Sequence, residues 1–244
     1  MRDYQQEFDG RVAFIRQQLE NAHATGIVYG NSGGKDCTLV GILCKAACDN
    51  TVGILLPCAS SRNFGSDTED ALAAAKQYNI ETRTVDLTGT RAAALEAISG
   101  ACTPTAPAIA NIAPRLRMMP LYTIGQTENR LVAGTGNRDE IFMGYFTKWG
   151  DGASDFDPIA DLTVSEVYEF LAWLKAPESI RTKAPSAGLF EGQTDEAEMG
   201  VTYAAIDRYL LTGEAEEPDR TVIERFHSRS EHKRRPVATY GGDQ

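Results

Sequence analysis

The sequence lacks three features that mark common classes of protein: a long apolar run, an excess of positive charge and paired cysteine motifs. No stretch approaches the roughly 20 apolar residues of a membrane span, and MRDYQQEFDG is too polar for a secretory signal. With 24 Lys and Arg against 34 Asp and Glu, the formal net charge is −10, which argues against broad nucleic-acid binding. We therefore expect a cytoplasmic protein with no membrane or nucleic-acid partner, in which an anionic ligand needs local basic groups.

The five cysteines are an odd number in a long chain and do not form a disulfide framework. Cys37, Cys44 and Cys48 fall on one helical face, so a metal cluster is one interpretation. However, the sequence contains no CxxC motif, and no histidine lies near these three residues. We therefore favour buried thiols in a reducing compartment.

Apolar strand patterns alternate with helical patterns along the first part of the chain. The expected strands cover residues 26–30, 51–57, 80–87 and 129–136, and the expected helices lie within 3–26, 35–48, 67–78, 90–99, 163–174 and 202–211. This alternation predicts a single α/β domain over residues 1–244, with a doubly wound, mainly parallel sheet flanked by helices. Ligands of such sheets lie beyond the carboxyl ends of the strands, where residues 30–37 and 134–140 fall.

Two irregular segments interrupt the second half of the chain. Residues 146–158 are rich in Gly and Asp, and residues 183–196 form a long loop rich in Pro, Gly and Ser. Loops of this length in compact domains are usually functional or mobile. We expect residues 183–198 to act as a lid over a ligand.

The stretch YGNSGGKDCTL, residues 29–39, has the composition of a phosphate-binding loop directly after an apolar strand. It is not a Walker loop, because only three residues separate Gly30 from Gly34 and Lys35 is followed by Asp36. The dinucleotide fingerprint GxGxxG does not fit either. The loop therefore belongs to neither of these two common nucleotide-binding types.

The physical parts of a phosphate cradle are nevertheless present in this loop. Glycines let the backbone approach a phosphate, Ser32 and Cys37 can donate hydrogen bonds, and the following helix begins with free N–H groups and a positive dipole. Asp36 would repel a phosphate unless a cation lay between them. We therefore interpret Asp36 as a magnesium ligand rather than a helix cap.

A strand followed by S-G-G-x-D-[S/C] resembles the pyrophosphate loop of the ATP pyrophosphatase family. GTGNRDEIFMGYFTKWGDGASDFDPIADLTVSEVYEF, PSAGLFEGQTDEAEMGVTYAAIDRYL and SEHKRRP are similar to the ammonia-dependent NAD synthetases over more than half of the chain. The resemblance implies that the nicotinate carboxylate of deamido-NAD attacks the α-phosphorus of ATP and releases pyrophosphate. Ammonia then displaces AMP to give NAD. It also implies Mg²⁺ and a homodimer with substrate at the shared interface.

The resemblance assigns roles to individual positions. ATP contacts are Gly30, Asn31, Ser32, Gly33, Gly34, Lys35, Asp36, Cys37, Thr135 and Ser186; metal ligands are Asp36 and Glu140; deamido-NAD contacts are Arg115, Lys148, Asp155, His232 and Lys233; the catalytic residues are Asp36 and Asp155. Several of these positions also have a plainer explanation. Thr135 suits a turn or a helix cap, and Ser186 an ordinary loop. Glu140, Arg115 and the basic end of the chain suit solvated surface.

Three positions depart from the pattern of that family. Val164 replaces the lysine expected at the start of the helix in DLTV and cannot grip ATP through a positive charge. Either Lys35, Arg138 or Lys183 compensates, or ATP binds more weakly. Cys37 replaces a serine and is a poorer hydrogen-bond donor, and Asn31 is polar where an apolar residue is common.

The nitrogen donor and the reaction class leave alternatives open. Glutamine-dependent relatives carry an additional amidohydrolase domain, and the helix that starts near residue 4 leaves no room for one, so we expect free ammonia as the donor. A different adenylating enzyme with the same loop is a second hypothesis, although no basic face or paired catalytic cysteines are evident. A degenerate nucleotide-binding homologue, motivated by Val164, is a third.

Overall fold

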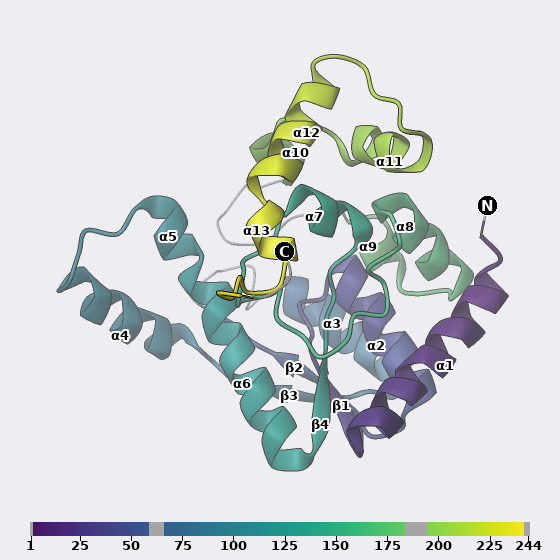
Figure 1. The fold of residues 1–244 in the computed structure, drawn as a ribbon. Coiled ribbons are helices and arrows are strands. Elements are labelled where there is room, and N and C mark those ends of the chain that lie inside the picture. The colour runs from purple at the N-terminus through teal and green to yellow at the C-terminus, as the bar shows by residue number, and fades with distance from the viewer. Residues whose placement is uncertain (1, 59–65, 184–194, 242–244) are drawn as a thin grey trace.

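The computed structural model describes residues 2–58, 66–183 and 195–241 (Figure 1). Its centre is a four-stranded sheet in the order β3-β2-β1-β4, and every neighbouring pair is parallel. The strands are β1 Gly26–Gly30, β2 Thr51–Leu55, β3 Glu81–Thr84 and β4 Arg130–Ala133. The predicted parallel sheet is therefore confirmed.

Helices cover both faces of this sheet (Figure 1). Those of the first two thirds are α1 Tyr4–Ala22, α2 Lys35–Ala47, α3 Ser66–Gln77, α4 Thr88–Ser99, α5 Ala106–Ala110, α6 Ile112–Glu128 and α7 Arg138–Met143. Those of the last third are α8 Val164–Trp173, α9 Glu178–Arg181, α10 Asp195–Met199, α11 Tyr203–Thr212, α12 Asp219–Arg229 and α13 Glu231–Arg234. None of the helices in the described ranges is long and apolar enough to cross a membrane.

Alternate side chains of the central strand supply two separate cores. Ile27 and Tyr29 are buried against α1, α2 and α8, whereas Val28 joins Val52 and Val132 beneath α6. Side chains alternate between the faces of a strand, so a strand buried on both faces is apolar at every position. This double burial explains the continuous apolar character of β1 and confirms the doubly wound α/β class.

The order of the strands fixes where a ligand can bind. From β1 the chain moves outward to β2 and β3, then returns to place β4 on the other side of β1. The connections after β1 and β4 therefore leave in opposite directions and open a crevice at the carboxyl ends of these strands. Residues 31–34 and 134–137 follow these two strand ends.

A second, smaller apolar cluster holds the helices of the C-terminal part together. Its buried members are Met143, Val164, Met199, Val201, Tyr203, Ile206 and Ile223, which come from α7 to α12. Val164 belongs to this cluster and is 4% exposed. The residue that departs from the family pattern is thus a core residue that ties α8 to the C-terminal helices.

Most of the longer elements lie where the sequence predicts them. The differences are α6, which contains Pro120, and the short or weakly buried helices α5, α7, α9, α10, α12 and α13, for which the sequence analysis set no bounds. Of the three cysteines on one helical face, Cys37 and Cys44 are buried and Cys48 is half-buried. Burial raises the pKa values of the Cys37 and Cys44 thiols, so both favour the neutral form.

Candidate functional site

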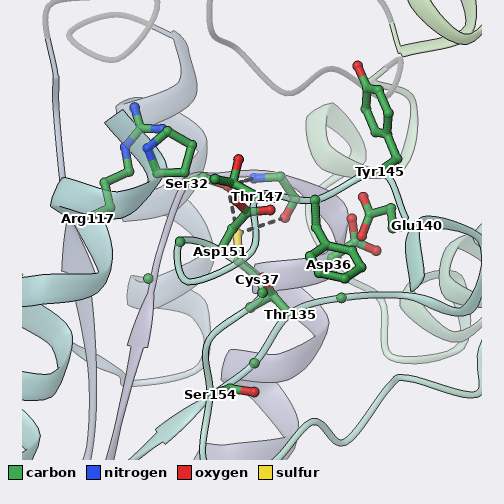
Figure 2. A pocket seen from close by; sticks show the side chains of 18 of the residues that line it. Ser32, Asp36, Cys37, Arg117, Thr135, Glu140, Tyr145, Thr147, Asp151 and Ser154 are labelled. Atoms are coloured by element: carbon green, nitrogen blue, oxygen red, sulfur yellow. Dashed lines mark hydrogen bonds between the residues drawn. The ribbon is translucent and has the colours of Figure 1, made fainter. Parts of the chain in front are cut away.

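A cavity of about 910 Å³ opens at the carboxyl ends of β1 and β4 (Figure 2). Its floor is the glycine loop and the first turn of α2, and the segment from Gly134 to Gly136 joins it from β4. Side chains of α6, α7, α12 and α13 complete its walls. The two segments expected to bind a ligand therefore meet in one place.

Asn31 holds the glycine loop in shape. Its backbone N–H donates to the carbonyl O of Ile54 (2.9 Å), and its side-chain oxygen accepts from the N–H of Gly33 (3.3 Å). Its side-chain nitrogen donates to the carbonyl O of Ala71 in α3 (3.4 Å). The polar residue noted as a departure from the family pattern is thus a buried brace between the loop and α3.

Cys37 is turned into the loop, whereas Ser32 is exposed. The thiol of Cys37 donates to the carbonyl O of Gly34 (3.2 Å) and lies 3.2 Å from the hydroxyl of Ser32. No side chain of the described residues caps the N-terminus of α2, where Gly34 is the N-cap. The first turn of α2 therefore keeps N–H groups for an anion, and its dipole favours negative charge there.

Asp36 and Glu140 bring two carboxylates together from the two strand ends (Figure 2). Asn137 connects them: its amide nitrogen donates to Asp36 (3.1 Å), and its backbone N–H donates to Glu140 (3.1 Å). Burial, and then the charge of Asp36, raise the pKa of Glu140 well above its ordinary value. The two carboxylates therefore repel each other unless a proton or a cation lies between them.

Lys35 supplies positive charge beside this pair. Its ammonium lies 2.7 Å from a carboxylate oxygen of Asp36 and faces the rings of Tyr168 and Tyr203 at 6.0 and 5.7 Å. Burial disfavours the charged amine, but Asp36 and Glu140 outweigh it and raise the pKa of Lys35. Lys35 thus remains protonated and offsets part of the carboxylate charge.

The donor set of Asp36 and Glu140 fits magnesium. Carboxylate oxygens are the ligands that Mg²⁺ prefers, and it is usually held by one or two carboxylates together with phosphate oxygens of a substrate. In the described part of the chain, no cluster of three or more His, Cys, Asp or Glu residues could hold a metal ion. The site therefore suits an ion that arrives with a polyphosphate, not a preformed protein cage.

Four of the five residues predicted to contact deamido-NAD lie close to one another, and one of them, Lys233, lines the cavity. A guanidinium nitrogen of Arg115 donates to the carbonyl O of Lys148 (3.4 Å), and the ammonium of Lys148 donates to the carbonyl O of His232 (2.6 Å). Lys233 lines the cavity, where its ammonium donates to the carbonyl oxygens of Gly144 (2.8 Å) and Phe146 (2.7 Å). The fold thus unites three distant segments of the chain, although their binding role stays a prediction.

Asp155 occupies a different position from the one its predicted role suggests. Its carboxylate accepts from the backbone N–H of Val132 (2.7 Å), so it pairs with the outer edge of β4. Its neighbour Asp157 lines the cavity instead and accepts from the N–H of Gly136 (3.0 Å). Burial raises the pKa of Asp157 to about 6, helped by Asp36. A catalytic role for Asp155 stays a prediction, and Asp157 is a cavity residue that the sequence analysis missed.

The remaining predicted residues divide into three groups. Thr135 and Lys183 line the cavity, and Lys183 forms ion pairs with Asp67 (2.7 Å) and Asp70 (2.8 Å). Arg138 turns to α11, where it donates to the carbonyl O of Leu210 (3.0 Å). Lys35 and Lys183 are therefore the two proposed substitutes for a lysine at position 164 that line the cavity. Ser186, and most of the lid predicted over residues 183–198, lie outside the described residues.

The sequence analysis did not predict two groups of arginines that line the cavity. Arg117 lies across the cavity from Asp36 and Glu140 and donates to the carbonyl O of Leu56 (3.1 Å), and burial lowers its pKa (Figure 2). Arg225 and Arg229 also line the cavity, from α12. Arginine is common on exposed helix faces, so only the packing of α6 and α12 identifies these side chains.

A buried carboxyl pair beside the site gives a prediction about pH. Asp139 is fully buried and accepts from the N–H of Val164 (2.7 Å), and one oxygen of Asp139 and one of Asp207 have no hydrogen-bond partner among the described residues, which a proton shared between the two carboxyls would provide. Burial, and then Asp207, raise the pKa of Asp139 to about 8. The folded protein therefore holds a proton that the unfolded chain releases, so the contribution of this pair to stability is fully present below about pH 4 and is lost as the pH rises towards 8.

The Asp139→Asn variant should remove this contribution, because an amide can donate to Asp207 at any pH. Its free energy of unfolding should fall by about 4 kcal/mol less than that of the wild type between pH 5 and pH 9, as measured by urea unfolding. Some loss remains, because the pKa values of Glu140 and Asp157 are also raised. The exposed Asp49→Asn variant is the control. Equal pH dependence in wild type and Asp139→Asn would refute the assignment.

The geometry can now be compared with known proteins. The family model for NAD synthase matches residues 7–238. The chain belongs to the NAD synthase family. Its sequence is 45% identical over 237 residues to the NH(3)-dependent NAD(+) synthetase of Carboxydothermus hydrogenoformans, covering 96% of both chains.

Two solved structures are similar over nearly their whole length. The NMN synthetase from Francisella tularensis has a TM-score of 0.93 and 36% identity, covering 99% of this chain and 100% of that one. The NH3-dependent NAD synthetase from Campylobacter jejuni has a TM-score of 0.79 and 28% identity, covering 98% and 100%. The resemblance inferred from the glycine loop and the second half of the sequence is therefore confirmed, as is the fold of an ATP pyrophosphatase.

Proposed function

We propose that this member of the NAD synthase family amidates deamido-NAD with ammonia, using ATP, to give NAD, AMP and pyrophosphate. One observation carries the proposal: the uncapped start of α2 and the pair of Asp36 and Glu140 meet at the strand switch point. Relatives of the same length are named for ammonia-dependent NAD synthesis. Ammonia as the donor follows from those names, and we propose that the enzyme works in the cytoplasm.

The proposed reaction has two steps, activation of the acid by ATP and attack by ammonia. A carboxylate oxygen of the acid bonds to the α-phosphorus of ATP, and the bond from that phosphorus to the bridging oxygen breaks, so pyrophosphate leaves with the electron pair. N–H groups of the glycine loop and of α2 hold the departing phosphates. Ammonia then bonds to the carboxyl carbon of the adenylate, and AMP leaves.

Asp36 and Glu140 would hold Mg²⁺ in this arrangement. The ion, when bound, neutralises charge on the polyphosphate and so stabilises pyrophosphate as a leaving group. The positive charge of Lys35 offsets part of the negative charge of the two carboxylates, and its 2.7 Å ion pair orients Asp36. Thr135, just beyond β4, lines the cavity, which supports the proposal that it contacts the nucleotide.

A second acid substrate is favoured by the structural comparison. The Francisella tularensis protein, named an NMN synthetase, has a TM-score of 0.93, against 0.79 for the Campylobacter jejuni NAD synthetase. Synthesis of NMN by the same chemistry starts from nicotinate mononucleotide, which lacks the adenylate half of deamido-NAD. We therefore propose nicotinate mononucleotide as the alternative substrate.

The test is an assay with ATP, MgCl₂, ammonium chloride and each acid in turn, with release of AMP, pyrophosphate and the amide measured. Turnover of deamido-NAD with the higher kcat/KM supports the first proposal, and a preference of about 10-fold or more for the mononucleotide supports the alternative. Nucleotide binding without turnover of either acid would identify a degenerate homologue and refute both. Turnover with another acid alone would identify a different adenylating enzyme.

We also propose that the chain forms a homodimer. Helix α4 has an alanine-rich sequence and no buried residue, and Ile98 in it is 40% exposed. On the neighbouring helix α6, Met119 is 49% exposed. Apolar side chains left open on paired helices suit an interface between two copies. Light scattering from the pure protein tests this proposal, and a monomer at micromolar concentration would contradict it.

A further inference from the structure

Three cations lie four residues apart along α12 and α13 and line the same wall of the cavity. Arg225, Arg229 and Lys233 therefore share one helical face, with Phe226 and Ser230 between them. We call Arg225 and Arg229 the α12 arginine pair. The chain as a whole has a net charge of −10, so two arginines make this cavity wall positive in a protein that is negative overall.

The wall that carries the α12 arginine pair is firmly attached to α7. The hydroxyl of Ser230 donates to the carbonyl O of Met143 (3.2 Å), and Arg234 donates to the carbonyl O of Phe142 (3.0 Å). Gly144, at the end of α7, has a φ of 64° and leaves no room for a Cβ beside the side chain of Ser230. The backbone that carries the two arginines is thus held in place by α7. These contacts do not involve the guanidinium groups of Arg225 and Arg229.

The guanidinium groups of the α12 arginine pair are not engaged by carboxylates of the described residues. Neither guanidinium group forms an ion pair or a hydrogen bond within those residues, and that of Arg225 has only a ring contact with Phe226 at 5.8 Å. By contrast, Lys233 on the same face already donates to two carbonyl oxygens. Two exposed arginines at helical spacing, facing a cavity, match the geometry needed to grip a phosphate.

The cavity must hold two anions at once if the proposed function is correct. The glycine loop and the start of α2 provide one anion site, beside Asp36 and Glu140. Those two carboxylates repel any second phosphate that is not shielded by the metal ion. The second anion is therefore expected on the wall of opposite charge, which is α12.

We propose that the α12 arginine pair binds the 5′-phosphate of the acid substrate, the phosphate on the nicotinate ribose. This inference rests on the proposed function, and it holds for deamido-NAD and for nicotinate mononucleotide because both carry that group. The phosphate is far from the reacting carboxyl in the covalent structure of either acid. Its capture on α12 therefore anchors one end of the substrate while the carboxylate reaches the α-phosphorus of ATP.

The test uses the Arg225→Gln, Arg229→Gln and double variants of the full chain, with KM measured separately for the acid and for ATP. For the double variant, KM for the acid should rise by about 10-fold or more, with KM for ATP and kcat within about 2-fold of wild type. Arg220→Gln is the matched control: Arg220 lies on the same helix but faces Tyr209 and Gly213 and does not line the cavity.

A substrate without the phosphate separates binding of that group from a general loss of activity. The ratio of kcat/KM for nicotinate mononucleotide to that for nicotinate riboside should fall about 10-fold in the double variant, and KM for the acid should depend less on salt. An unchanged ratio, or a rise in KM for ATP alone, would overturn the inference and assign the pair to solvent or to ATP. A wild-type protein that amidates neither acid would instead refute the proposed function.

Discussion

Asp36→Asn is expected to lower kcat by about 100-fold or more while leaving the protein folded. Asp36 is one of the two cavity carboxylates that we propose as ligands of Mg²⁺, and an amide provides neither the charge nor the second oxygen ligand. The side chain stays the same size, so its contact with Asn137 can be replaced by a similar one. Magnesium titration of the rate and circular dichroism of the variant measure the two effects.

Asp49→Asn is the matched control for this loss of activity. Asp49 lies just beyond α2, its side chain is fully exposed, and its partner is Lys45 (3.2 Å). Its removal should change kcat by less than about 2-fold, since exposed ion pairs contribute little. A rate for Asp36→Asn equal to that of the control, with an unchanged magnesium requirement, would rule out Asp36 as a metal ligand. Glu140→Gln should resemble Asp36→Asn in its magnesium dependence.

Gly33→Ala should lower the free energy of unfolding by about 3 kcal/mol and reduce activity by about 100-fold. Gly33 has a φ of 75°, and a Cβ there would overlap the backbone carbonyl O of Asp67 at the start of α3. The left-handed conformation costs about 1–2 kcal/mol for alanine, and forced displacement of packed backbone adds about 1–3 kcal/mol. The same displacement moves the N–H groups that would hold the phosphates, so activity should fall more than stability alone explains.

Gly213→Ala separates the two causes. Gly213 has the same φ of 75° at the end of α11, but a Cβ there meets no atom within 4 Å. This variant should lose only the conformational part, about 1–2 kcal/mol, and keep wild-type activity. Urea unfolding and steady-state kinetics of both variants provide the comparison. If Gly33→Ala lost no more stability than Gly213→Ala, the contact with Asp67 would not constrain the loop.

The sequence predicted best where a single element carried its own signal. β1 is apolar at nearly every position because both of its faces are buried, and α2 is apolar all round for the same reason. Helix α4 was recognisable although none of its residues is buried, since alanine-rich segments favour helix by themselves. By contrast, α12 buries only Ile223 and has few apolar residues, and the sequence analysis set no bounds for it.

The sequence predicted part of the candidate site, where the order of the elements decides which residues meet. Asp36 and Glu140 follow strand ends that parallel pairing brings together, so their meeting could be inferred from the order of elements. Asp155 and Asp157 are two residues apart in one loop, and no sequence rule decides which of them turns into the cavity. The structure turns Asp157 inward, because Asp155 satisfies the backbone N–H of Val132 at the sheet edge.

The sequence by itself determined the parallel α/β fold, the glycine loop after the first strand and membership of the NAD synthase family. Those properties reside in local patterns: glycines where backbone approaches a ligand, and apolar strands at regular intervals. Only the tertiary structure decided that Val164 is a core residue, that Asn31 braces the loop and that Arg225 and Arg229 face the cavity. Burial and side-chain direction depend on contacts between segments far apart in the chain, and a residue's own neighbours in sequence do not specify them.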